Sequence, residues 1–126
     1  MSIDDTLAAH IDPERLDIHE TVRRLNSHLG TTLVAALAGS RDSTAPSRWA
    51  DPAALNPPDA ARARLRTAHH VWLAIADSEG PNTARVWFQG LNPFLGDTSP
   101  VIALREGRAR DVVLAAHAFL NGTWSA

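Results

Sequence analysis

Apolar positions recur at helical spacing along most of this chain. In residues 16–25 and 33–37 they lie three or four positions apart, a pattern that predicts two short helices. A longer pattern over residues 59–79 predicts a long helix, which the Gly80-Pro81 pair stops. Since no strand-like alternation and no internal repeat accompany these patterns, the sequence predicts an all-α fold.

Glycine and proline mark the expected boundaries in the first half. Gly30 separates the first two helices, and either Thr31 or Thr32 is expected to cap the second one, which ends at Gly39. Residues 50–58 contain three prolines, so we expect a connection there and no regular helix.

Similar signals divide the last third. Because the Pro93 ring disfavours the helical conformation of Asn92, this pair is expected to end the preceding helix. Ser99 is the expected cap of the next helix and Pro100 its first residue, where a missing N–H costs nothing. Gly107 then closes that helix before a final amphipathic one.

Composition limits the class of protein. A chain of 126 residues can bury one good core, or two small helical units that share an interface. The absence of cysteine excludes disulfides and cysteine-based zinc sites. The start of the chain is acidic and not signal-like, and apolar runs such as residues 112–116 are far too short to span a membrane. We therefore expect a cytoplasmic protein that makes no membrane contact.

The net charge of −2 hides an asymmetry. Residues 1–22 carry six acidic side chains and one arginine, whereas residues 23–66 carry seven arginines and three aspartates. A basic middle behind an acidic arm permits a phosphate-contacting face. An ordinary solvated helix surface explains the same pattern.

The sequence offers little catalytic chemistry. Its six histidines form no compact metal-ligand pattern, and the adjacent His69 and His70 point to different faces of one helix. It contains no glycine-rich phosphate loop, nucleophile elbow or convincing carboxylate pair. We expect no enzymatic activity, no metal and no cofactor.

The last third resembles the C-terminal domain of the Xre/MbcA/ParS-like antitoxins. The residues that carry the resemblance are Trp87, Asn92-Pro93-Phe94-Leu95-Gly96, Thr98-Ser99-Pro100 and Gly107. Any one of these features alone would mean nothing, and together they are fairly specific. The alternative is a helical hairpin with an ordinary Asn-Pro turn.

The middle region resembles an Xre-type helix-turn-helix. The first helix would open after Leu29-Gly30 and the recognition helix would end in Ser47-Arg48-Trp49. Pro46 departs from the pattern, and the helix survives in a short form if Ser43 is its cap. The candidate DNA contacts are Arg41, Ser43, Thr44, Ser47 and Arg48. The alternative is a region that only packs or dimerises.

The resemblance implies an antitoxin of a bacterial type II toxin–antitoxin module whose partner is a RES-domain toxin that degrades NAD. The C-terminal region would cover the active site of the toxin, so NAD would be bound by the partner and not by this chain. The candidate toxin-binding residues are Trp87, Phe88, Leu91, Asn92, Pro93, Leu95, Leu104, Asn121, Gly122, Thr123 and Trp124. For Trp124, the alternative is that it folds back onto the core.

The expected organisation has three parts: an acidic arm (residues 1–14), a helix-turn-helix-like region (residues 15–58) and a small helical toxin-binding domain (residues 59–126). We expect this chain to form a homodimer or a hetero-oligomer with the toxin. We also expect it to repress its own operon by binding operator DNA. A free-standing helix-turn-helix regulator that dimerises through its C-terminal helices is the rival hypothesis. A third is a stand-alone interaction domain.

Overall fold

The computed structural model describes residues 16–122, and every regular element in this range is a helix. In chain order the elements are α2 (Ile18–Leu29), α3 (Thr31–Ala38), α4 (Ala45–Trp49), α5 (Asp59–Glu79), α6 (Pro81–Gln89), the 3-10 helix η2 (Pro93–Leu95), α7 (Pro100–Arg105) and α8 (Ala109–Leu120). A single bridge between Asn92 and Thr98 is the β contact in this range. The predicted all-α fold is confirmed.

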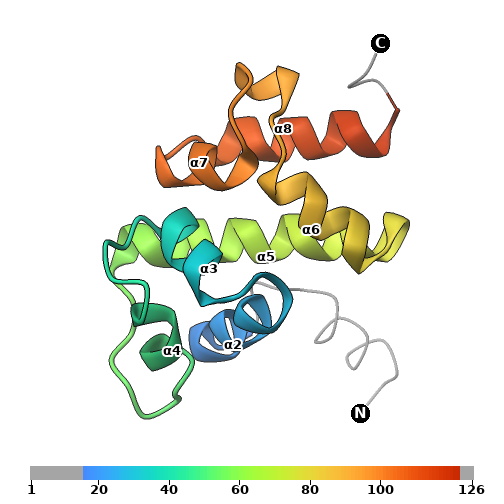
Figure 1. Cartoon of the computed structure of the whole chain (residues 1–126). Helices are drawn as coiled ribbons and strands as arrows, with labels where there is room; N and C mark the ends of the chain where they lie inside the picture. The colour runs from blue at the N-terminus through green and yellow to red at the C-terminus, as the bar shows by residue number, and fades with distance from the viewer. Residues whose placement is uncertain (1–15, 123–126) are drawn as a thin grey trace.

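The long helix α5 organises the molecule. It runs across the middle, with α2 and α4 on one side and α6, α7 and α8 on the other (Figure 1). Its buried residues are Ala61, Leu65, Ala68, His69, Val71, Trp72 and Ile75. Helix α3 contacts both α5 and α7, so it links the two sides.

The hydrophobic core is continuous from the first described helix to the last. Trp72 shows this continuity, because its ring stacks on His28 of α2 at a centroid distance of 4.5 Å and lies 6.2 Å from the ring of Phe88 in α6. Mutual burial of large apolar side chains is the main stabilising contribution in such a core. The predicted division into a helix-turn-helix-like region and a toxin-binding domain after residue 58 stays a prediction. Residues from both sides of this boundary belong to the same core.

Two helix starts differ from the sequence-based expectation by one residue. Gly30, at φ 85°, is itself the N-cap of α3, and its carbonyl accepts from the N–H of Val34 at 3.1 Å. Neither Thr31 nor Thr32 caps this helix. Glycine readily adopts a positive φ, so α3 can begin at the residue directly after Gly30. Thr44, and not Ser43, is the N-cap of α4.

Arginine side chains tie distant segments together by donating to backbone carbonyls. Four such hydrogen bonds are Arg85 Nε to the His28 carbonyl (3.0 Å), Arg64 Nε to Leu104 (2.9 Å), Arg105 Nη1 to Ala36 (3.2 Å) and Arg66 Nη1 to Leu16 (3.1 Å). The last carbonyls of a helix have no partner within the helix and carry partial negative charge. Several of the arginines therefore serve the fold.

None of the helices in residues 16–122 combines the length and the apolar character that crossing a membrane requires. Nor does this range bring together three histidine, aspartate or glutamate side chains in an arrangement suited to a metal ion.

Candidate protein-binding site

Helix α6 and the segment after it form the base of the site. The helix begins with Pro81 and buries Ala84, Trp87 and Phe88 on its inner face. Gly90 ends it in an extended conformation with φ −80° and ψ 154°. The chain therefore leaves the helix as a short extended segment, not as a tight turn.

Asn92 closes the loop that follows. Its side-chain Oδ1 accepts from the N–H of Phe94 at 2.9 Å, and its carbonyl accepts from the N–H groups of Leu95 and Asp97. Its own N–H donates to the Thr98 carbonyl at 3.0 Å. Asparagine suits this position because its short amide side chain can replace a backbone group in a turn.

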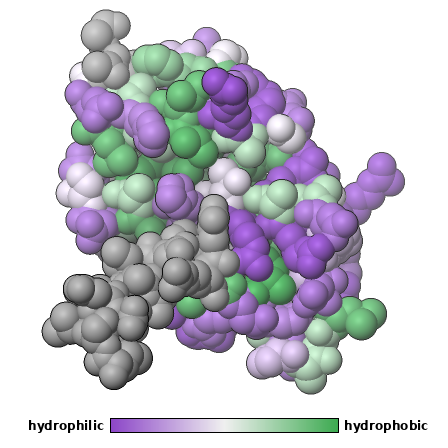
Figure 2. All heavy atoms as spheres, turned by 180° about the vertical axis from the view of Figure 1, so that it is seen from behind, coloured by the Kyte–Doolittle hydropathy of each residue, from purple (hydrophilic) through white to green (hydrophobic). Residues whose placement is uncertain are grey.

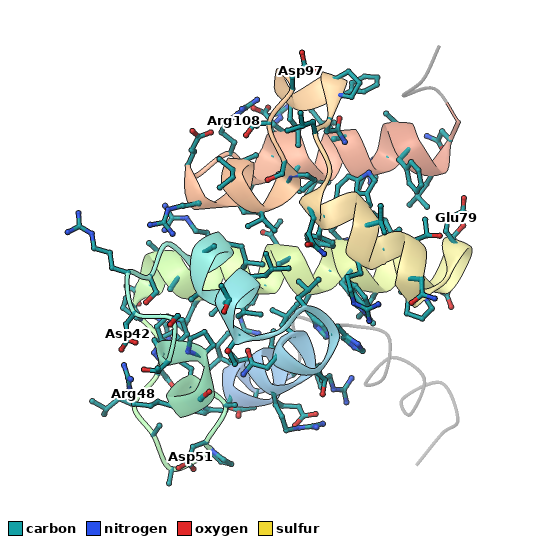
Figure 3. All side chains as sticks on the ribbon, viewed as in Figure 1. Asp42, Arg48, Asp51, Glu79, Asp97 and Arg108 are labelled. Atoms are coloured by element: carbon teal, nitrogen blue, oxygen red, sulfur yellow. The ribbon has the colours of Figure 1, made fainter. Side chains whose placement is uncertain are left out.

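The loop is fixed to the helices around it. Ser99 Oγ accepts from the N–H of Ile102 at 3.2 Å, which confirms Ser99 as the cap of α7. Arg108 Nη1 donates to the Leu95 carbonyl at 3.2 Å, while its Nε pairs with Asp111 at 3.0 Å. Asp97 and Arg108 lie at the same end of the molecule in Figure 3.

An apolar groove of about 270 Å³ lies between α6, the extended segment and α8. Its lining residues are Thr83, Val86, Trp87, Gly90, Leu91, Asn92 and Phe119, and none of them is charged. The rings of Trp87 and Phe119 lie 6.3 Å apart, centroid to centroid. The enclosed Nε1–H of Trp87 finds no acceptor among the described residues. We call this feature the α6–α8 groove.

Large apolar side chains stand exposed on or beside the α6–α8 groove. Val86 is 70% exposed, Leu91 75% and Phe94 50%. On the face seen in Figure 2, hydrophobic side chains gather over the half of the molecule that contains α6 and α8. Exposed apolar residues that cluster in this way are typical of binding surfaces.

The predicted toxin-binding residues divide into surface and lining positions. The exposed ones are Leu91, Pro93, Asn121 and Gly122. Trp87 and Asn92 are almost fully buried but line the α6–α8 groove. The predictions for Thr123 and Trp124 lie outside the described residues. The structure thus brings Leu91, Trp87 and Asn92 together at one place.

Three predicted contact residues need correcting. Phe88, Leu95 and Leu104 are fully enclosed in the hydrophobic core, so their side chains cannot touch a partner in this conformation. Phe88, for example, packs edge-to-face on Trp87 at 5.3 Å. When neighbouring residues are all apolar, the sequence does not reveal which side chains face inward. Here Phe88, Leu95 and Leu104 face inward.

Val86 and Phe94 belong to the exposed set although the sequence analysis did not select them. The sequence indicated that Val86 lies on the same side as two other groove residues, because Thr83, Val86 and Gly90 follow one another at helical spacing. They lie beside the buried residues of α6, which are Ala84, Trp87 and Phe88. Phe94 lies inside the Asn-Pro motif, where its neighbour Leu95 was preferred. Its exposure follows from the η2 turn, which directs Leu95 inward.

The predicted DNA-binding residues share a second surface, residues 40–49, which we call the α4 surface. All five are exposed: Arg41, Ser43, Thr44, Ser47 and Arg48. Helix α4 itself has only five residues. A recognition helix that enters the major groove needs enough length to present several side chains to base edges, and α4 offers little more than one turn.

Asp42 holds the polar groups of the α4 surface together. Its Oδ1 accepts from the hydroxyl and the N–H of Thr44 at 2.6 and 2.8 Å, and its Oδ2 lies 3.0 Å from Arg48 Nη1. Asp42 and Arg48 are close together at one edge of the molecule in Figure 3. The Thr44 hydroxyl, the Thr44 N–H and then Arg48 lower the pKa of Asp42 to about 2. A permanent carboxylate thus sits within the candidate DNA-binding face.

Most other arginines of the basic middle also have partners. They are Arg23 and Arg24 with Glu20, Arg62 with Asp59, and Arg64 and Arg66 with the Leu104 and Leu16 carbonyls. Arg41 makes no such contact within residues 16–122. The charge asymmetry of the sequence therefore yields far fewer available cations than its arginine count indicates.

Comparison with known proteins gives one informative likeness. No model of a known protein family matches the sequence, and no curated protein does. Among solved structures, the fold is similar to that of a chain in the crystal structure of the M. tuberculosis MbcT–MbcA toxin–antitoxin complex, with a TM-score of 0.67 and 23% identity. The match covers 85% of this chain and 96% of the other. The two chains share the helical fold.

Proposed function

We propose that this chain is the antitoxin of a type II toxin–antitoxin module whose partner is a RES-domain toxin that degrades NAD. The observation that supports this proposal most strongly is the uncharged α6–α8 groove with its exposed residues Val86, Leu91 and Phe94. The likeness to a chain of a toxin–antitoxin complex and the Asn-Pro motif support the same reading.

In this proposal the chain inhibits by covering the partner. Apolar side chains around the α6–α8 groove supply most of the binding free energy, since burying one large apolar side chain stabilises a complex by about 2 kcal/mol. Residues 121–124, which follow α8, extend the contact. The bound chain then lies over the NAD site of the toxin and excludes the dinucleotide, and it needs no catalytic group of its own.

Coexpression with a cognate RES-domain toxin tests the proposal. The unaltered chain should restore growth and cellular NAD, and Leu91→Glu should abolish both effects because it places a charge beside an apolar surface. Leu55→Glu is the matched control, since Leu55 is 90% exposed on the loop between α4 and α5. Full rescue by Leu91→Glu, or none by the unaltered chain, would contradict the proposal.

Weak operator binding through the α4 surface is a second candidate activity. The observation in its favour is Arg41, an exposed cation without a partner in residues 16–122. Phosphate contacts release counterions, so the affinity should fall as salt rises. A gel shift at low salt with the upstream DNA of its own gene tests this candidate, and no retardation would exclude it.

The rival reading, a regulator that uses α6–α8 for dimerisation, makes a different prediction. Under it, Val86 and Leu91 would be buried between two copies of this chain. Sedimentation of the free chain separates the readings, because Leu91→Glu would then convert a dimer to a monomer. Under the antitoxin proposal this substitution leaves the mass of the free chain unchanged.

A further inference from the structure

The extended segment of residues 90–92 has one paired backbone edge and one unpaired edge. The N–H and C=O of Asn92 both bond toward residues 97 and 98, at 3.0 Å each. In an extended chain the backbone groups of successive residues point to opposite sides. The N–H and C=O of Leu91 therefore point away from Thr98, and neither bonds to another residue in the described range 16–122.

The unpaired edge borders the α6–α8 groove. Gly90, Leu91 and Asn92 are three of its lining residues, opposite Val86 and Phe119. Gly90 fits closely against the last turn of α6, since a Cβ atom there would lie 3.3 Å from the Val86 carbonyl. A free donor and a free acceptor thus lie next to an apolar recess that carries no charge.

We infer that the toxin docks an extended segment along residues 90–92, in an inference that rests on the function proposed above. One residue of this segment pairs its backbone N–H and C=O with those of Leu91. An adjacent residue places an uncharged apolar side chain in the α6–α8 groove. The docked segment adds a strand to the Asn92–Thr98 bridge.

The chemistry of the surface selects an extended occupant over a helical one. A helix satisfies its backbone groups internally, so a helix in the groove would leave the N–H and C=O of Leu91 facing an apolar partner. An extended peptide offers an unpaired donor and acceptor at each second residue and directs the side chains between them to one face. It therefore satisfies the edge and the groove together, and the uncharged lining matches an uncharged side chain.

Two substitutions at one position separate the backbone from the side chain. Leu91→Ala truncates the apolar side chain and keeps the N–H, whereas Leu91→Pro replaces the leucine side chain by a small ring and also removes the N–H. Proline is compatible with the fold here, because the Leu91 N–H has no partner among the described residues and Gly90 already has the extended conformation that precedes proline. We expect both variants to melt within a few degrees of the unaltered chain.

Titration against the cognate RES-domain toxin gives the first readout. Leu91→Ala should weaken binding about tenfold, and Leu91→Pro should weaken it about a further tenfold because a hydrogen bond is lost as well. Equal affinities of the two variants would overturn the backbone pairing and leave the proposed function intact. Failure of the unaltered chain to bind would overturn both.

Amide exchange gives a second readout that needs no substitution. In the free chain the Leu91 amide should exchange rapidly, and in the complex it should slow at least tenfold, as a hydrogen-bonded amide does. The Leu55 amide is the matched control, since it belongs to an exposed leucine with no hydrogen bond within the described range, and Leu55 lies between α4 and α5 and does not line the groove. A Leu91 amide that exchanges as fast in the complex as in the free chain would overturn the inference.

Discussion

The α4 surface and the α6–α8 groove are both exposed, yet they differ in what a partner would have to displace. On the α4 surface, Asp42 already binds Thr44 and Arg48. In the α6–α8 groove, the exposed side chains are apolar, and the Leu91 backbone is unpaired within residues 16–122. A ligand at the first surface must compete with internal contacts, whereas a ligand at the second only removes apolar area from water.

This difference shows that exposure alone is a poor guide to function. All five predicted DNA contacts are exposed, but two of them belong to the Asp42 network. At the α6–α8 groove, Val86 and Leu91 expose apolar side chains, and the Leu91 backbone has no hydrogen bond within residues 16–122. For this molecule we therefore rank the two candidate sites by their unsatisfied surface rather than by exposure.

The largest expected effect is a loss of folding stability at acidic pH, and it tests whether both surfaces depend on the same hydrophobic core. His69 of α5 is fully buried, and neither ring nitrogen has a partner in the described range. Burial first, and Arg24 second, lower its pKa to about 4. The unfolded chain binds the proton more tightly, so stability is complete above about pH 6.5 and falls by about 3 kcal/mol as the pH decreases to about 4.

Urea unfolding across this pH range measures the effect, and His69→Leu should remove most of the slope. His28, whose pKa is lowered mainly by burial, acts in the same direction and leaves a smaller residual slope. The exposed His117 supplies the control variant, His117→Gln, which should keep the full slope. If the free energy of unfolding of His69→Leu depended on pH as steeply as that of the unaltered chain, another group would be responsible for the loss of stability in acid. If probes near α4 and near α6 reported separate unfolding transitions, the two surfaces would not share one core.

A charge in the α6–α8 groove should break toxin binding directly. Val86→Asp should weaken it about a hundredfold, because an unpaired carboxylate would have to leave water on docking. The melting temperature should stay nearly constant, since Val86 is 70% exposed. Leu55→Asp places the same charge beside the α4 surface and should bind the toxin normally. Calorimetric titration of both variants against the toxin decides whether the groove or the α4 surface is the docking face.

The buried turn residue provides a smaller and more structural effect. Asn92→Ala removes the acceptor for the Phe94 N–H and should destabilise the chain by about 1 kcal/mol. Because the loop also fixes residues 90–92, toxin binding should weaken about tenfold, which thermal melting and titration measure together. Pro93→Ala is the control, since Pro93 is exposed, and it should affect both quantities less. Normal toxin binding by a destabilised Asn92→Ala would show that the turn serves only folding.

The smallest effect is expected at the α4 surface. Asp42→Asn removes the carboxylate that pairs with Arg48 and should strengthen binding to nonspecific DNA several-fold, with a steeper salt dependence. Asp51→Asn makes the same charge change nearby, where within residues 16–122 the carboxylate accepts only from the Ala53 N–H, and should have a weaker effect. Fluorescence anisotropy at several salt concentrations measures both. Equal responses would mean that net charge alone, and not the release of Arg48, controls the affinity.

Local signals in the sequence predicted most of the fold. Gly30, Gly80 and Ser99 mark boundaries because each acts on its own backbone, so no tertiary information is required. The expectation that the Asn92-Pro93 pair ends the preceding helix was wrong, since α6 ends at Gln89 with Gly90 as its C-cap, and Asn92 instead caps η2. The exact start of a helix is less predictable: Gly30, and not Thr31 or Thr32, is the N-cap of α3, and Thr44, and not Ser43, is the N-cap of α4.

The tertiary part of the site was less accessible to sequence reasoning. Phe88, Leu95 and Leu104 look like surface anchors in a motif, but their burial depends on α5, α7 and α8 packing around them. Likewise, nothing local indicates that Arg64 reaches the Leu104 carbonyl, which is 40 residues away in the sequence. Motif matching located the site, and only packing separates its lining from its core.

Hydrogen–deuterium exchange of the chain with and without the RES-domain toxin tests the central claim most directly. The account predicts slower exchange on complex formation in residues 83–95, which include the unpaired Leu91 amide, with residues 40–49 unchanged. Protection of residues 40–49 with unchanged exchange in residues 83–95 would contradict it, and would place the toxin on the α4 surface.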